Sequence, residues 1–245
     1  MDSAARFQEL LQPLASSIRT LYPGWRMRIY HNVTQQDSKV WTKFCQLYCD
    51  HDHLDLCDTR QLPGVGDLHS QWPVGRFWRF QVVGDPTVAV FGCRDVDSYV
   101  LPRERAAVAV WLESGHQYHV MRDLPLHHAP MLAGLWGGSN YHNFSLALQV
   151  RQALLGVKVN LWKFYDQHVL QHRVWPLVRN KAVIHDSFNC RHQESLGPMQ
   201  SWPTRRKGFT YVGYGPSKGM YSRILRRTKC PRKCRPEGHQ DWMYC

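Results

Sequence analysis

Two carboxylates, Asp95 and Asp97, directly follow the apolar run Val88–Cys93. Such a run predicts a strand, and because the chain leaves extended geometry where a strand ends, both side chains can turn toward one point. Two hard oxygen ligands suit Mn2+ or Mg2+ held jointly with phosphate oxygens, and the cation would stabilise the charge of a departing diphosphate. The alternative is an ordinary loop with two turn-forming aspartates, since Asp-x-Asp also arises by chance.

A second apolar strand, Val183–His185, ends in a histidine. It would place an imidazole at the same edge of the sheet as the two carboxylates, and His185 is then a candidate third ligand for manganese. The alternative is a capping or hydrogen-bonded loop histidine, because the chain contains 14 histidines.

Two further segments combine aromatic residues with charges or glycines. Tyr118–Asp123 predicts a strand with a charged end, where Arg122 and Asp123 either serve a substrate or form a structural ion pair. Trp136 is flanked by glycines, which offers a flat face on which a sugar ring or a base could stack. The alternative is a buried tryptophan beside a tight turn, because tryptophan is usually mostly buried.

Arg76 and Arg79 lie three residues apart on one face of a predicted helix, a spacing that allows bidentate contacts to a diphosphate. Exposed helical arginines usually have no special role. Asp166 opens another predicted helix, where a carboxylate is favoured for capping alone. From local physics, a catalytic or acceptor-binding role for Asp166 is the less economical interpretation.

Helical and strand patterns alternate along the chain, which argues for an α/β fold with a largely parallel central sheet flanked by helices. Ligands of such sheets bind beyond the carboxyl ends of the strands. The only boundary in the pattern is near Ser195, where a domain over 1–195 gives way to a basic, cysteine-containing extension over 196–245. Periodicity predicts helices over 7–21, 40–54, 75–83, 102–114, 143–155 and 166–177, and strands over 26–30, 87–93, 118–122 and 181–185.

Lysine and arginine outnumber aspartate and glutamate by 31 to 19. This surplus favours an anionic partner, which charge alone leaves open among nucleic acid, an acidic membrane surface and a phosphorylated or acidic substrate. Much of the surplus lies near the end of the chain, where a solvated tail is the simpler interpretation.

Six of the eight cysteines fall into an early group, Cys45, Cys49 and Cys57, and a late group, Cys230, Cys234 and Cys245. Their spacing favours disulfides over a zinc site, because neither group holds a Cys-x-x-Cys pair. Disulfides form in the oxidising lumen of the secretory pathway. Glycosylation sequons at Asn32 and Asn143 indicate the same compartment. Together the cysteines and the sequons predict a protein of the secretory-pathway lumen. Because no run of about 18 apolar residues is present, we expect its targeting segment, and any membrane contact through it, to be missing from this sequence.

Several segments, taken in order, resemble GT-A glycosyltransferases found in capsule and surface-polysaccharide contexts and in some animals. The resemblance extends from Tyr22 to Gly213, and several motifs in the right order are more specific than any one of them. It is carried by residues 22–31, 76–80, 94–98, 121–125, 134–137, 166–167, 175–177 and 185–188.

The resemblance implies a single Rossmann-like domain that binds a UDP- or GDP-sugar donor and a glycan or glycoprotein acceptor, in the Golgi lumen. It implies a metal pair, Asp95 and Asp97, with His185 as a further ligand. If the reaction inverts, Asp123 or Asp166 could deprotonate the acceptor hydroxyl. Residues implied near the donor phosphates are Arg76, Arg79 and Arg94, and those lining the sugar and acceptor side are Trp136, Gly137, Asp123 and Asp166.

One departure from the family pattern motivates a second hypothesis. GT-A domains usually open with a strand and loop that hold the base, and here the sequence starts at the helix before Tyr22. Either the sequence is a truncated piece, or the base pocket is incomplete. The second case gives the alternative function, a catalytically inactive binding or scaffold protein with an incomplete donor site. A nucleic-acid-binding protein ranks last, because aromatic residues are not interleaved with the basic tail as a stacking platform requires.

Overall fold

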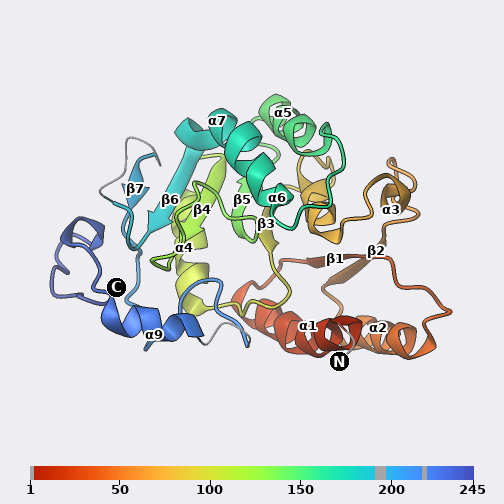
Figure 1. Ribbon diagram of the computed structural model, residues 1–245, viewed down its shortest axis with the longest axis horizontal. Coiled ribbons are helices and arrows are strands. Elements are labelled where there is room, and N and C mark those ends of the chain that lie inside the picture. Colours follow the sequence, from red (N-terminus) through yellow and green to blue (C-terminus); the bar gives the residue numbers. More distant parts are fainter. Residues whose placement is uncertain (1–2, 191–196, 217–219) are drawn as a thin grey trace. The chain divides into compact units, whose positions relative to one another are not determined.

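The computed structural model describes residues 3–190, 197–216 and 220–245 (Figure 1). The chain forms two compact units: the first comprises Met1–Arg79 with Lys158–Leu161, and the second comprises Phe80–Val157 with Trp162–Cys245. The boundary predicted near Ser195 lies outside the described residues. In the part of the chain that is described, no helix has both the length and the apolarity to cross a membrane.

The first unit pairs two helices with two parallel strands. Helix α1, Ser3–Leu21, and helix α2, Ser38–Asp50, pack together and bury apolar residues at helical spacing, among them Leu14, Ile18 and Leu47. The predicted helix over 40–54 ends at Asp50, because the chain turns at His51 into an additional strand. The strands are β1, Met27–His31, and β2, Leu54–Asp58, and short helices follow at α3, Leu68–Gln71, and η1, Gly75–Val82, a 3-10 helix whose last residues belong to the second unit.

The second unit is built on a five-stranded sheet of order β3-β5-β4-β6-β7. Strand β5 runs antiparallel to both of its neighbours, whereas β4, β6 and β7 run parallel to one another. The sheet is therefore mixed, and the prediction of a mostly parallel sheet is wrong because β5 was not recognised as a strand. The bounds are β3 Val90–Arg94, β4 Tyr118–Arg122, β5 Leu135–Ser139, β6 Ala182–Asp186 and β7 Met199–Gln200.

Because β3 and β4 both oppose β5, the strands β3, β4 and β6 share one direction and their carboxyl ends meet at one edge. Helix α4, Pro102–Glu113, packs against β4, and α5, Phe144–Leu155, begins at the cap Asn143, whose side chain accepts the N–H of Leu146. The predicted helix over 166–177 is three pieces: α6 Tyr165–Val169, a π-helical turn η2 Leu170–Val174, and α7 Trp175–Val178. The remaining pieces are η3 Arg179–Lys181, α9 Met220–Arg227 and η4 Arg232–Cys234.

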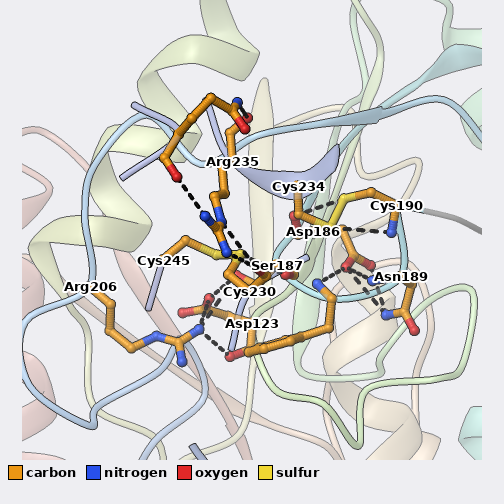
Figure 2. Close-up of a disulfide and its surroundings, with 12 residues drawn as sticks. Asp123, Asp186, Ser187, Asn189, Cys190, Arg206, Cys230, Cys234, Arg235 and Cys245 are labelled. Atoms are coloured by element: carbon orange, nitrogen blue, oxygen red, sulfur yellow. Dashed lines mark hydrogen bonds and ion pairs between the residues drawn. A yellow bond between two sulfur atoms is a disulfide. The ribbon is translucent and has the colours of Figure 1, made fainter. Parts of the chain in front are cut away.

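Two disulfides secure the end of the chain, Cys190–Cys234 and Cys230–Cys245 (Figure 2). All four of these cysteines are buried beside one another. The late cysteine group therefore forms disulfides as predicted, with Cys190 as an additional partner. The early group, Cys45, Cys49 and Cys57, forms no disulfide in the structure as described.

Candidate functional site

The turn Asp95–Ser98 follows β3 at the shared carboxyl edge of the sheet. The backbone N–H of Ser98 donates to the carbonyl of Asp95 at 3.2 Å, and both aspartates are partly exposed. The strand end therefore places Asp95 and Asp97 where the sequence predicted them, with both carboxylates near solvent.

The Asp95 carboxylate lies against the backbone of Gly134, the residue before β5. A Cβ at position 134 would stand 2.7 Å from the carboxylate carbon of Asp95, so only glycine leaves room for the carboxylate there. The loop is also held from the other side by Gln167 of α6. The N–H of Ala133 donates to Gln167 Oε1 at 3.2 Å, and Gln167 Nε2 donates to the carbonyl of Met131. The loop before β5 is thus fixed between α6 and Asp95.

A segment distant in sequence, Tyr211–Gly215, lies along the other side of the turn. The hydroxyl of Ser98 donates to the carbonyl of Gly213 at 3.2 Å, and the N–H of Tyr99 donates to the carbonyl of Tyr214 at 2.7 Å. Gly215 lies so close to the Asp97 carbonyl that any Cβ would overlap it. The aspartate turn is therefore a positioned loop.

Tyrosine rings accompany this segment. The Tyr99 and Tyr214 ring centroids are 5.9 Å apart, and Tyr99 is 40% exposed. Burial, followed by the neighbouring tyrosines and Asp97, raises the pKa of Tyr211, so its hydroxyl stays protonated. Sequence reasoning missed these residues; the available signal was the alternation of aromatic residues with glycine in Tyr211–Gly215.

Asp123 is wholly buried, and Arg103 binds it in a bidentate ion pair. Arg103 Nε lies 3.1 Å from Oδ2 and its Nη2 lies 3.1 Å from Oδ1. Arg206 Nη2 adds a contact of 2.7 Å to Oδ1, the Ser187 hydroxyl donates to the same oxygen, and the N–H of Val212 donates to Oδ2 at 3.0 Å (Figure 2). The carboxylate is saturated by protein donors.

The electrostatics of Asp123 follow from these partners. Burial alone would raise its pKa, but the charges of Arg103 and Arg206 outweigh burial and lower the pKa to about 2. A carboxylate that is ionised, enclosed and fully hydrogen-bonded cannot approach an acceptor hydroxyl, so the structure does not present Asp123 as a general base. Its role is to anchor the segment that reaches the Asp95–Ser98 turn, because Val212 and Gly213 are adjacent.

Arg122 and Asp123 form ion pairs, as one interpretation of the sequence held, but with separate partners. Arg122 pairs with the buried Asp186, whose Oδ1 also accepts the N–H groups of Phe188 and Asn189 at 2.7 Å. The reason is strand geometry, since consecutive side chains on a strand point to opposite faces.

His185 is wholly buried in β6, and its Nδ1 lies 2.9 Å from Nε2 of His119 in β4. Burial, with a smaller effect of Arg103, lowers the pKa of His185 to about 4, so the ring is neutral near pH 7. In the described residues, the group of three potential metal ligands within 4.8 Å of one another is Asp186, Cys190 and Cys234, whose cysteines share a disulfide. The structure thus does not gather His185 with Asp95 and Asp97.

Trp136 is 1% exposed and packs edge-to-face on Phe91, with ring centroids 5.4 Å apart. The expectation that it stacks on a sugar is wrong in this structure, because its ring faces are covered; the alternative of a buried tryptophan holds. Gly137 also serves packing. A Cβ there would stand 2.5 Å from the carbonyl oxygen of Phe91 on the adjacent strand.

Arg94 ends β3 and pairs with the buried Glu104, while its Nη2 donates to the carbonyl of Tyr99 at 2.8 Å. It thereby ties the turn to α4. Asp166 is 4% exposed in the first turn of α6, next to Gln167. Arg76 and Arg79 are partly exposed in the first unit, where Arg79 Nε donates to the carbonyl of Arg76 at 2.9 Å.

A comparison with protein-family models finds no match. A comparison with curated proteins likewise finds none. One similar solved structure is described as the crystal structure of a glycosyltransferase involved in the glycosylation of the major capsid of PBCV-1. It is 14% identical to this chain, covers 82% of this chain and 100% of its own, and superimposes with a TM-score of 0.41. Similarity at that level does not establish a shared function.

Proposed function

We propose that this protein is a metal-dependent glycosyltransferase that moves a sugar from a UDP- or GDP-sugar to a hydroxyl of a glycan or glycoprotein in the secretory pathway, in the Golgi lumen. The observation that carries the proposal is the Asp95–Ser98 turn. Its two aspartates are partly exposed at the carboxyl edge of the sheet. The turn that carries them is held by the segment Tyr211–Gly215 and by Arg94, and the Asp95 carboxylate lies against Gly134. A turn whose backbone is already positioned lowers the ordering cost of binding a cation.

The donor set fits a hard divalent cation. Asp95 and Asp97 would supply two oxygen ligands, and Mg2+ or Mn2+ bound through one or two carboxylates usually completes its shell with water and substrate phosphates. Such an ion would supply charge stabilisation for the departing diphosphate. His185 is not needed in this arrangement.

Two further roles are assigned to residues around the turn. The partly exposed rings of Tyr99 and Tyr214 offer the stacking faces for the donor that were expected of Trp136. Asp166 stays the candidate base for an inverting reaction, because its neighbour Gln167 holds the loop that contacts Asp95. Its buried position requires α6 to shift before an acceptor can reach it.

A catalytically inactive binding protein is the second candidate function. It is favoured by the burial of Trp136 and Asp123, two residues expected to meet substrate. This alternative predicts that the Asp95–Ser98 turn binds no nucleotide, with or without a metal.

Calorimetric titration distinguishes the two. Mn2+ with UDP, and separately with GDP, is titrated into the wild type, into the double variant Asp95→Ala with Asp97→Ala, and into a control, Glu113→Ala with Asp241→Ala, which removes two exposed carboxylates elsewhere in the second unit. The transferase proposal expects metal-dependent binding that only the first double variant loses. Absence of metal-dependent binding in the wild type overturns it in favour of the inactive protein.

A further inference from the structure

The end of the second unit carries a dense set of exposed cations, which we call the basic face. Few negative charges oppose these cations, because the described residues from 197 to 245 contain two acidic residues, Glu237 and Asp241. On α9, Arg223, Arg226 and Arg227 are spaced i, i+3, i+4 and so share one side of the helix. The members of the basic face are Arg205, Lys207, Arg223, Arg226, Arg227, Lys229, Arg232 and Lys233, all exposed.

Helix α9 is fixed by packing on its opposite side. Leu225 is 1% exposed, the Ser222 hydroxyl donates to the carbonyl of Phe209 at 3.0 Å, and Tyr221 meets Tyr211 with ring centroids 6.3 Å apart. A side chain that projects from a rigid backbone loses less conformational entropy on binding than one on a mobile tail. The packing therefore distinguishes α9 from a solvated basic tail.

The disulfides give the same rigidity to the residues after α9. Arg232 and Lys233 lie between the disulfide-bonded Cys230 and Cys234, and Lys229 directly precedes Cys230. The Arg235 guanidinium donates to the carbonyl of Cys230 and closes the loop between these cysteines (Figure 2). The cations thus stand on a cross-linked scaffold.

One segment of the chain links the basic face to the candidate site. The guanidinium carbon of Arg226 lies 4.6 Å from the ring centroid of Phe209, and Tyr211 contacts α9 through Tyr221. Both aromatic residues belong to the same stretch of chain as Gly213 and Tyr214. Those two residues hold the Asp95–Ser98 turn through Ser98 and Tyr99. The segment Phe209–Tyr214 therefore contacts both α9 and the Asp95–Ser98 turn.

The chemistry of the basic face selects among anionic partners. Insertion of an amphipathic helix into a bilayer requires an exposed apolar side, and on α9 the apolar side packs into the protein at Leu225. Nucleic acid is disfavoured because the two disulfides indicate an oxidising compartment. A glycan that bears sulfate or carboxylate groups along its length is found in oxidising compartments and needs no exposed apolar helix side. Guanidinium groups on a rigid scaffold bind such anions bidentately.

We propose that the basic face is a docking surface for an anionic glycan, and, as a deepening that rests on the transferase proposal, that this glycan is the acceptor. Binding then neutralises several cations at once and releases counterions from the polymer. Its affinity falls steeply with salt concentration, as for other polyanions.

The test measures binding of heparin, as a sulfated probe, to the full chain by biolayer interferometry at several salt concentrations. The variant Arg223→Gln, Arg227→Gln, Lys229→Gln removes three charges from the basic face. The control Arg173→Gln, Arg179→Gln, Lys181→Gln removes three exposed charges elsewhere in the second unit. We expect the variant to bind about tenfold or more weakly with a shallower salt dependence, and the control to bind like the wild type.

Three parallel probes complete the design: desulfated heparin, vesicles containing phosphatidylserine, and single-stranded DNA. The proposal expects the sulfated chain to bind most tightly. Equal losses in variant and control, or tighter binding to vesicles or DNA than to heparin, overturn it. Asp95→Ala with Asp97→Ala is expected to retain heparin binding, so a failure of nucleotide binding and a failure of glycan docking are separate results.

Discussion

Asp95 and Gly134 are in direct contact: a Cβ at position 134 would stand 2.7 Å from the carboxylate carbon of Asp95. Because that carboxylate is the end of a flexible side chain, an added methyl group displaces it without unfolding the strand. Gly134→Ala should therefore weaken metal-dependent nucleotide binding about tenfold or more. The unfolding free energy should change by less than about 1 kcal/mol.

Gly92→Ala is the matched control for this prediction, because position 92 lies on β3 with nothing within 4 Å of an added Cβ. It should leave nucleotide affinity unchanged. Wild-type affinity in Gly134→Ala would mean that the position of Asp95 does not matter for binding.

Removal of the Asp123 carboxylate should destabilise the protein strongly. Asp123→Asn leaves Arg103 and Arg206 buried without their counter-charge, and loss of one partner of a buried pair costs about 3–5 kcal/mol. Urea unfolding measures the difference. The solvent-exposed Arg26 and its partner Asp55 give the comparison, since solvent screens this ion pair and Asp55→Asn should destabilise the protein far less. Similar costs for the two variants would refute the anchoring role of Asp123.

The buried pair His119 and His185 should make the protein sensitive to mild acid. Burial, with the charge of Arg103 as a smaller cause, lowers the pKa of His185 to about 4, and burial lowers that of His119 well below 6.5. The unfolded state therefore binds more protons than the folded state between about pH 6.5 and pH 4. Stability is complete above pH 6.5 and is lost as the pH falls through this window.

The measurement is the unfolding free energy at pH 7.5 and at pH 5. The expected loss is on the order of 2 kcal/mol for the His185 shift alone. His185→Gln should reduce this pH dependence, with the part due to His119 remaining, whereas the exposed His128→Gln should retain all of it. An equal pH dependence in all three proteins would contradict the prediction.

The two disulfides should contribute most of their stabilisation to the end of the second unit. Cys230→Ser with Cys245→Ser should lower the unfolding free energy by about 2–4 kcal/mol and increase hydrogen exchange in α9. Cys45→Ser, at an exposed cysteine outside the disulfides, is the control and should change neither quantity. Unchanged exchange in α9 after loss of the disulfide would show that packing alone holds the helix.

Local patterns predicted many of the elements. Helix α1, strand β4 and helix α5 follow from periodicity and capping, and the end of β3 correctly positions Asp95 and Asp97. Strand β5 was missed because Gly137 and Gly138 suppress strand propensity. Those glycines are required by tertiary contacts, since a Cβ at 138 would meet the Tyr118 ring at 2.8 Å. No local pattern contains that constraint.

The candidate site was only partly predictable for the same reason. The partners of Asp123 are Arg103, Arg206 and Val212, which lie up to 89 residues away in sequence. The sequence of the strand alone therefore does not reveal that this carboxylate is already bound by other residues of the protein. Trp136 was misassigned because flanking glycines indicate exposure as readily as close packing. The segment Tyr211–Gly215 belongs to the site only because it contacts a turn more than a hundred residues earlier, and no local pattern predicts that contact.

The anchoring of Asp123 also has a consequence for synthesis on the ribosome. Its strand β4 emerges early, together with Arg103, but the remaining charge of Arg206 and the N–H of Val212 follow only after most of the chain has been translated. Burial of the carboxylate with part of its partners is costly. The core of the second unit is therefore expected to close late, so that a nascent chain stalled before Arg206 should remain open to protease and to chaperones.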